Sequence, residues 1–262
     1  MKQKMKPPKP IMRIASCSFG KDSIATILLA LEHHEPLDRV VYAEVMFDHG
    51  KGISGEIPEH IEWIYNSAIP RLEQMGVKVD VVRCEKDYVY YFRNKHSKGK
   101  WKDKICGFPI GGKCVINRDC KLAPIKMYYK QFRQNYNIVQ YVGIAQDEPV
   151  RLARLMFNQV SLLDKYNQTE ADAMRMCEKA GLLSPIYKIS ARGGCWFCPN
   201  AKIKQFAYIR KYHPQMWTEL QELSKTPNLC SYGFKYGKTL QEIEKQIDVI
   251  EWVQDRQLLL DL

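Results

Sequence analysis

The residues from Ser16 to Ser23, Ser-Cys-Ser-Phe-Gly-Lys-Asp-Ser, have the composition of a loop that binds phosphate. They lie between two apolar runs, Met12–Ala15 and Ile24–Leu31, which predict a strand before the loop and a helix after it. Backbone N–H groups and the helix N-terminus would then face one point and favour an anion there. The Lys21 ammonium adds positive charge at that point. An ordinary turn, in which Ser and Asp cap the helix, is the alternative interpretation.

Two pairs of cysteines predict a metal centre. Cys195 and Cys198 are separated by two residues in a glycine-flanked turn, and Cys114 and Cys120 form a second pair upstream. Four thiolates favour one Cys₄ site, which takes either a [4Fe-4S] cluster or Zn²⁺; the proline after Cys198 favours the cluster. A redox dithiol is the alternative for the second pair. Cys106 is an alternative to one of the four ligands.

Composition limits the kind of protein. No apolar run among the 262 residues approaches the roughly 20 residues needed to cross a bilayer, and Met1–Pro10 does not resemble a secretory signal. We therefore expect a cytoplasmic protein without a membrane partner. Nine cysteines in a reducing compartment favour metal or sulfur chemistry over disulfides.

The chain is basic. Its net charge of +11 favours a polyanionic partner, either a nucleic acid or a nucleotide, although a solvated basic surface is the alternative. The densest basic segment is Arg93–Lys104, which surrounds Trp101 and has no helical or strand period. We expect this segment to form a loop that reaches nucleic acid, with Trp101 as a stacking surface.

Strand and helix patterns alternate along the chain. Apolar and β-branched runs predict strands at Arg39–Asp48, Val77–Cys84 and Ile138–Ile144, and apolar residues at helical spacing predict helices at Ile57–Met75 and Ile125–Tyr136. This order predicts an α/β fold with a doubly wound, mostly parallel, Rossmann-like sheet. Residues 202–223 and 240–260 predict a helical C-terminal part.

Two positions follow predicted strands at the edge where open α/β sheets bind ligands: Asp48 and the segment that contains Arg151. We place an α/β nucleotide-binding domain at residues 1–184. The cysteine-containing segment and the C-terminal helices occupy residues 185–262. The boundary near Pro185 is weakly marked, and a single domain is the alternative.

In this order the motifs resemble the phosphoadenosine phosphosulfate reductase family of the PP-loop ATP pyrophosphatase (adenine nucleotide alpha hydrolase) superfamily. The first loop is similar to the Ser-Gly-Gly-x-Asp-Ser loop of that superfamily, with Phe19 in place of one glycine. Further matching segments are Arg118–Ile125, Gly143–Arg151 and Ser184–Cys198. The last two are most similar to family members that transfer sulfur during DNA phosphorothioation.

The resemblance implies ATP or a related adenine nucleotide and Mg²⁺ as cofactors, and a sulfur-donor protein as a partner. It implies that catalysis is carried out by Lys21, Asp22, Asp48 and Arg151. It also implies a channel for anions, which is lined by Arg118, Lys121, Arg151 and Arg192. The residues that it assigns to nucleotide binding are Ser16, Ser18, Phe19, Gly20, Lys21, Asp22, Ser23, Asp48 and Gly143.

Three functions are compatible with these motifs. The first is an ATP-dependent nucleotidyl-transfer enzyme of the ATP pyrophosphatase type, which modifies a nucleic acid or a nucleotide in a sulfurtransferase-like reaction. The second is a thiol-dependent sulfonucleotide reductase that uses Cys230, although the family's Glu-Cys-Gly-x-His tail is missing from the sequence. The third is a non-catalytic component that binds nucleotide or nucleic acid within a larger system.

Overall fold

The computed structural model describes residues 8–110, 114–190 and 193–260, and only the backbone of residues 254–260. The chain forms two compact units, and each is assembled from three segments. Unit 1 contains Met1–Glu44, Glu59–Arg83 and Leu122–Tyr187, and unit 2 contains Val45–Pro58, Cys84–Lys121 and Lys188–Leu262. No helix of the described part is long and apolar enough to cross a membrane.

The two units are not two consecutive stretches of the chain, as the predicted domains were. One change of unit, at Tyr187, lies close to the boundary that we expected at Pro185. However, two segments that we placed in the first domain, Val45–Pro58 and Cys84–Lys121, belong to unit 2 together with the C-terminal part. Segments distant in sequence therefore combine in both units.

A five-stranded parallel sheet forms the centre of unit 1, with the strand order β5-β2-β1-β6-β7. The strands are β1 (Ile11–Ser16), β2 (Arg39–Glu44), β5 (Val79–Arg83), β6 (Asn137–Tyr141) and β7 (Gln159–Val160). The chain leaves β1 toward β2 on one side, whereas β6 pairs with β1 on the other side. The carboxyl ends of β1 and β6 therefore border the topological switch point, where open α/β sheets bind their ligands.

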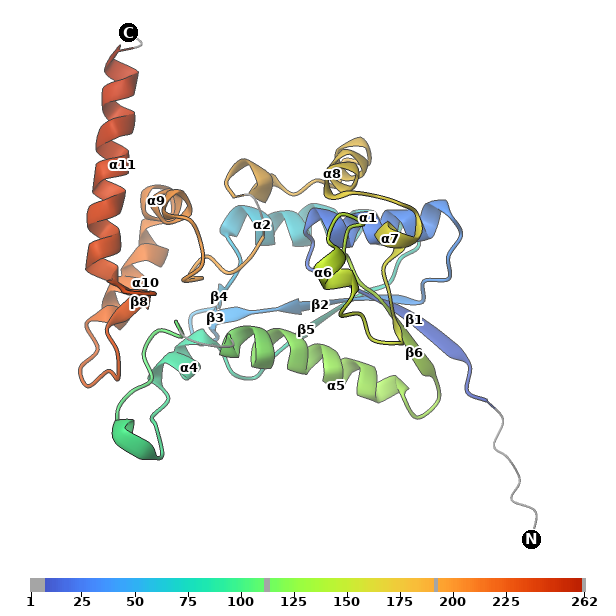
Figure 1. Ribbon diagram of the computed structural model, residues 1–262, viewed down its shortest axis with the longest axis horizontal. Helices are drawn as coiled ribbons and strands as arrows, with labels where there is room; N and C mark the ends of the chain where they lie inside the picture. Colours follow the sequence, from blue (N-terminus) through green and yellow to red (C-terminus); the bar gives the residue numbers. More distant parts are fainter. Residues whose placement is uncertain (1–7, 111–113, 191–192, 261–262) are drawn as a thin grey trace. The chain divides into compact units, whose positions relative to one another are not determined.

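Helices cover both faces of this sheet, which confirms the predicted α/β class. On one face lie α1 (Lys21–Glu32), α7 (Leu162–Lys165) and α8 (Glu170–Lys179), and on the other lies α5 (Ala123–Phe132) (Figure 1). The strand residues alternate accordingly. Ala15 and Val40 belong to the core under α1, whereas Ile14 and Val41 pack with Tyr128 of α5. Such burial on both faces explains why the strands are almost continuously apolar.

The helix predicted at Ile57–Met75 is present, but a π-helical turn interrupts it. Its parts are α2 (Pro58–Trp63), the turn Ile64–Ala68 and α3 (Ile69–Gln74). Pro70 has no N–H to donate within the helix, and the Ile69 N–H bonds to the carbonyl five residues earlier, at Ile64. The widened turn thus lets one helix continue through a proline.

The single strand predicted at Arg39–Asp48 is wrong in one respect, because the chain divides it at Val45. β2 ends at Glu44 within the parallel sheet of unit 1. The following residues form β3 (Met46–Asp48) in unit 2, which pairs antiparallel with β4 (Ile53–Ser54). Both parts are apolar and β-branched, so the pattern along the chain does not mark the change of sheet.

Unit 2 contains short strands and helices around aromatic side chains. Its elements are β3, β4, α4 (Tyr88–Arg93), a 3₁₀ turn (Gly99–Trp101), a π-helical turn (Asn117–Leu122, whose last residue is in unit 1), α9 (Ile203–Tyr212), α10 (Pro214–Ser224), β8 (Gly233–Lys235), β9 (Lys238–Thr239) and α11 (Leu240–Leu260). Phe47, Tyr88, Trp196 and Phe197 pack with ring centroids 4.0–5.3 Å apart. Trp196 and Phe197 of this aromatic cluster lie within the Cys195–Cys198 turn. Two short elements of unit 1 remain: α6 (Pro149–Leu152) and a 3₁₀ turn (Pro185–Lys188, with Lys188 in unit 2).

Candidate functional site

The predicted phosphate loop connects β1 to α1 at the switch point of unit 1. Ser16 ends the strand and Lys21 begins the helix, as the apolar pattern predicts. Phe19 has φ of 57°, a left-handed conformation that an L-residue other than Gly, Asn or Asp rarely adopts. Its ring is fully buried and packs edge-on against Tyr42 and Trp63. Burial of the ring therefore offsets the backbone strain, and only the Phe19 backbone can contact a ligand.

Hydrogen bonds hold the loop in shape. The buried Ser23 hydroxyl accepts a bond from the Ser18 N–H and donates one to the Gly20 carbonyl, at 3.2 and 2.9 Å. The Lys21 N–H donates to the Tyr187 phenol oxygen at 2.7 Å. Burial raises the pKa of Tyr187, so this phenol keeps its own proton at neutral pH. Tyr187 thus places a further hydroxyl at the N-terminus of α1, a feature that its position in the sequence did not suggest.

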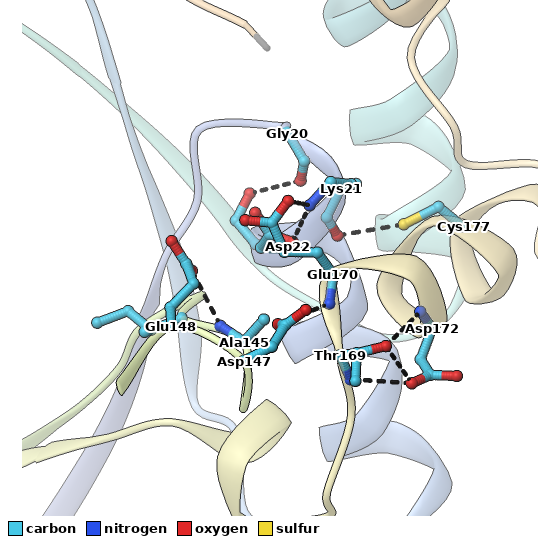
Figure 2. A network of polar contacts seen from close by, with 12 residues as sticks. Gly20, Lys21, Asp22, Ala145, Asp147, Glu148, Thr169, Glu170, Asp172 and Cys177 are labelled. Atoms are coloured by element: carbon cyan, nitrogen blue, oxygen red, sulfur yellow. Dashed lines mark hydrogen bonds and ion pairs between the residues drawn. The ribbon is translucent and has the colours of Figure 1, made fainter. Parts of the chain in front are cut away.

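Lys21 is the cation of the loop. Its Nζ lies 2.6 Å from an Asp22 carboxylate oxygen and 3.0 Å from one of Glu170, and its side chain is 11% exposed (Figure 2). Burial by itself would lower the pKa of Lys21, but the hydrogen bonds and charges of the two carboxylates raise it. Lys21 is therefore fully protonated at neutral pH. Burial raises the pKa of Asp22 despite the bond to Lys21.

The segment after β6 closes against this loop. A Cβ atom on Gly143 would lie 2.7 Å from both Asp22 C and Ser23 N, so only glycine fits beside the first turn of α1. The Glu148 carboxylate accepts a hydrogen bond from the Ala145 N–H at 3.1 Å (Figure 2). It also pairs with Arg151 at 2.5 Å. The structure thus brings Gly143 to the loop by close packing.

Two acidic residues near the loop, Glu170 and Glu148, come from segments distant in sequence. Glu170 begins α8, and its N–H bonds to an Asp147 carboxylate oxygen at 3.1 Å, which ties α8 to the segment after β6 (Figure 2). The charge of Glu148 contributes to the raised pKa of Asp22. Sequence reasoning missed Glu170 and Glu148 as parts of the site. The Asp147-Glu148 pair at the end of a strand was the available signal for Glu148.

Other predicted residues of the loop have structural partners. The hydroxyls of Ser16 and Tyr129 share a hydrogen bond of 2.6 Å, which joins β1 to α5. Cys17 is buried, and burial raises the pKa of its thiol to about 11, so it is not a thiolate at neutral pH. Asp48 belongs to unit 2, where it accepts a hydrogen bond from the Lys51 N–H in the β3–β4 turn.

Three of the four predicted metal ligands line one cavity of about 350 Å³ in unit 2. They are Cys114, Cys195 and Cys198. Burial raises the pKa of Cys195 to about 12, and neighbouring Lys121 opposes that increase. Cys120 does not line the cavity; its Sγ donates to the Lys86 carbonyl at 3.4 Å. The Cys120 thiol therefore lies outside the cavity lining. Burial raises its pKa, and the neighbouring Cys84 and Cys195 thiols raise it further.

The turn that carries Cys195 and Cys198 is fixed to the strand segment before Glu56. The Trp196 N–H donates to the Gly55 carbonyl and its indole N–H to the Ser54 carbonyl, both at 2.9 Å. The Cys198 N–H bonds back to the Cys195 carbonyl at 3.0 Å, which closes the turn. Both thiols are thereby held by backbone contacts to a distant segment.

Lys121 brings a positive charge to the same cavity. Its Nζ lies 3.5 Å from a buried Glu56 carboxylate oxygen. Burial by itself would lower the pKa of Lys121, but Glu56 and the nearby Cys195 raise it, so Lys121 carries its charge at neutral pH. Sequence reasoning missed Glu56, which has no local pattern to mark it.

The metal centre itself stays a prediction. Among the described residues, no group of three or more His, Cys, Asp or Glu side chains is arranged to hold a metal ion. The donor set that faces the cavity nevertheless fits a thiophilic metal or an iron–sulfur cluster, because it contains three cysteines and a compensating lysine. Cys106 lies elsewhere in unit 2, where its carbonyl accepts a hydrogen bond from Cys230 Sγ at 2.9 Å.

The remaining basic residues of the predicted channel have different surroundings. The Arg118 guanidinium is exposed and pairs with Asp119, its neighbour in sequence, at 2.6 Å. Arg192 lies outside the described residues. In the Arg93–Lys104 segment, Lys100 and Lys104 lie over the exposed Trp101 ring, at 5.0 and 5.1 Å from its centroid.

Comparisons with known proteins give a distant structural similarity. No family model matches the chain, and no curated protein matches its sequence. Among solved structures, the chain is similar to the U34-tRNA thiolase NcsA from Methanococcus maripaludis with its [4Fe-4S] cluster. The identity is 13%, the TM-score is 0.41, and the match covers 86% of this chain and 76% of that chain. At this TM-score we draw no conclusion about this chain from the similarity.

Proposed function

We propose that the protein is an ATP-dependent nucleotidyl-transfer enzyme that modifies a nucleic acid by sulfur transfer. The observation that carries the proposal is the position of the Ser16–Ser23 loop at the switch point of a parallel sheet. There the first turn of α1, the Lys21 ammonium and the Gly143 backbone come together. A helix N-terminus with an adjacent cation stabilises phosphate groups.

In the proposed reaction an acceptor oxygen attacks the α-phosphorus of ATP, and the bond to the departing pyrophosphate breaks. A sulfur nucleophile then attacks the acceptor's carbon or phosphorus atom that carries the adenylated oxygen. The bond between that atom and the oxygen breaks, and AMP leaves with the oxygen. Lys21 would balance the charge of the phosphates, and the N–H groups of α1 would donate to their oxygens. The carboxylates of Asp22, Glu148 and Glu170 would offer oxygen ligands to Mg²⁺ bound with the nucleotide, and Mg²⁺ there would offset the charge of the leaving pyrophosphate.

The cavity of unit 2 supports the sulfur part of the proposal. Cys114, Cys195 and Cys198 would hold a [4Fe-4S] cluster or Zn²⁺, with Lys121 reducing the net negative charge of the thiolates. A centre held by these three thiolates alone would keep a position for a reactant, as catalytic metal sites do. This arrangement suits a centre that takes part in chemistry better than one that only stabilises the fold.

Release of pyrophosphate tests the proposed function. With ATP, Mg²⁺ and unmodified tRNA or DNA, we expect the anaerobically purified protein to release pyrophosphate, and Lys21→Ala to lower the rate by about 100-fold because one charge-stabilising donor is lost. The control is Lys78→Ala, since Lys78 is exposed and precedes β5 at the opposite edge of the sheet. Equal rates in Lys21→Ala and wild type would contradict the assignment. Sulfite release from phosphoadenosine phosphosulfate would favour a reductase instead.

A further inference from the structure

Helix α9 of unit 2 presents a basic and aromatic stripe to the solvent. Its residues Lys204, Tyr208, Lys211 and Tyr212 follow each other at intervals of four, three and one, so they share one side of the helix. The opposite side, with Phe206 and Ile209, is buried. The stripe is therefore not part of the core that holds α9 in place.

A hollow of about 180 Å³ lies along this stripe. It is lined by Lys204, Ala207, Tyr208, Lys211 and Tyr212 of α9 and by Ile250 and Glu251 of α11, and the two helices are in contact (Figure 1). Glu251 does not make the hollow acidic, because its carboxylate pairs with Arg210 at 2.5 Å.

The aromatic rings of the stripe form a continuous surface. The ring centroids of Tyr208 and Tyr212 lie 4.7 Å apart, and Tyr212 is 58% exposed. Lys211 Nζ lies over the Tyr212 ring, 5.7 Å from its centroid. An exposed ring flanked by ammonium groups can stack on a base while the lysines contact the adjoining phosphates.

The charge of the segment agrees with such a ligand. Residues 202–212 contain Lys202, Lys204, Arg210 and Lys211 and no acidic residue, in a chain of net charge +11. A protein partner of acidic composition would use the lysines but not the exposed rings. Stacking rings interleaved with lysines are typical of surfaces that bind single-stranded nucleic acid without reading its sequence.

We propose that the α9 stripe of Lys204, Tyr208, Lys211 and Tyr212 binds a single-stranded segment of the nucleic-acid substrate. The inference rests on the proposed function for the choice of substrate. It is separate from the Arg93–Lys104 segment, which the sequence had indicated. Lys204 and Lys211 contact phosphates in this proposal, and Tyr212 stacks on a base.

Fluorescence anisotropy with a labelled oligodeoxythymidylate, without ATP, tests the stripe. We expect Lys204→Gln/Lys211→Gln to weaken binding and to reduce the slope of log K against log salt by about 0.7 for each lysine. The matched control is Lys78→Gln/Lys130→Gln, which removes two exposed lysines of unit 1 and should leave affinity and slope unchanged. Equal slopes in the two double variants would overturn the proposal.

The tyrosine is tested separately from the charge. Tyr212→Ala should weaken binding by about 5- to 100-fold through loss of stacking, whereas Tyr212→Phe should restore it, because the ring remains. A Tyr212→Ala variant with wild-type affinity would also overturn the proposal.

Pyrophosphate release by the wild-type protein with ATP, Mg²⁺ and unmodified tRNA or DNA separates this proposal from the proposed function. If ATP is cleaved but no variant of α9 changes DNA binding, only the stripe is wrong. If the oligonucleotide binds through the stripe but ATP is not cleaved, only the proposed function is wrong. Competition by duplex DNA as strong as by the single strand would contradict the preference for single strands.

Discussion

Individual residues of the first loop divide into those that shape it and those that can bind a ligand. Phe19 and Ser23 shape it, one through a buried ring in a left-handed conformation and the other through bonds to its neighbours. Lys21 offers charge, and Tyr187 offers a phenol proton at the helix N-terminus. Gly143 also shapes the loop, because it packs directly against the backbone of Asp22 and Ser23. A substitution at this position therefore tests the shape of the loop most directly.

Gly143→Ala should disturb the loop directly. The new Cβ would lie 2.7 Å from Asp22 C and Ser23 N, so the backbone must shift, and we expect a loss of about 1–3 kcal/mol in the free energy of unfolding. Nucleotide affinity should fall as well. Urea denaturation and calorimetry with ATP measure the two effects.

Gly50→Ala is the control for that substitution. Its Cβ would meet only an Asp48 carboxylate oxygen at 3.3 Å, at the end of a side chain that has to shift by only a few tenths of an ångström. A Gly143→Ala variant that unfolds at the same urea concentration as Gly50→Ala would contradict the close packing of the loop.

At the scale of elements, the N-terminus of α8 places the Glu170 carboxylate beside Lys21 of the Ser16–Ser23 loop. A capping box begins this helix: the Asp172 N–H bonds to the Thr169 hydroxyl at 3.2 Å, and the Thr169 N–H bonds to the Asp172 carboxylate at 2.9 Å (Figure 2). Glu170 is the first residue of α8 and meets Lys21. The cap therefore fixes the position of a charge at the loop.

Thr169→Ala should weaken this arrangement. Loss of the cap costs about 1 kcal/mol of folding free energy, and Thr169→Ser should restore most of it, since serine keeps the hydroxyl. Thermal unfolding measures the loss. An equal loss in the serine variant would show that the cap is not the cause.

The same cap makes α8 sensitive to acid. Hydrogen bonds from the side chain and the N–H of Thr169 lower the pKa of Asp172 from its ordinary value. The stabilisation that this carboxylate contributes is therefore present above the ordinary pKa of aspartate and is lost as the pH falls through the lowered value.

At the scale of the whole molecule, the chain passes repeatedly between two units. Cys114 and Cys195 come from two different segments of unit 2, and Leu122–Tyr187 between these segments folds in unit 1. The arrangement of the cysteines is thus a property of the complete fold. Metal analysis of cysteine variants tests it on the whole chain.

Substitution of single cysteines should separate the ligands from the other thiols. We expect Cys114→Ala, Cys195→Ala and Cys198→Ala each to lose most of the iron and sulfide, or the zinc, of anaerobically purified protein. Cys120→Ala should retain it, because Cys120 does not line the cavity. A loss in Cys120→Ala as complete as in Cys195→Ala would show a four-cysteine site. Wild-type protein with neither metal would contradict the centre altogether.

The sequence by itself determined the α/β class and the strand, loop and helix around Lys21. These features depend on local patterns: β-branched runs form strands, and apolar residues at helical spacing form helices whichever segments they later contact. When strands and helices alternate along a chain, a parallel sheet with helices on both faces is the regular arrangement that buries their apolar sides. The loop motif consists of eight consecutive residues, Ser16–Ser23, so it can be recognised without knowledge of distant contacts.

Only the tertiary structure decided which distant residues meet. It placed Glu170 beside Lys21, and it left Cys120 out of the cavity lining that Cys114, Cys195 and Cys198 share. It also divided the apolar run Arg39–Asp48 between two sheets. Each of these outcomes depends on contacts between segments far apart in the chain. Spacing along the sequence carries no information about such contacts, because packing of the folded chain selects them.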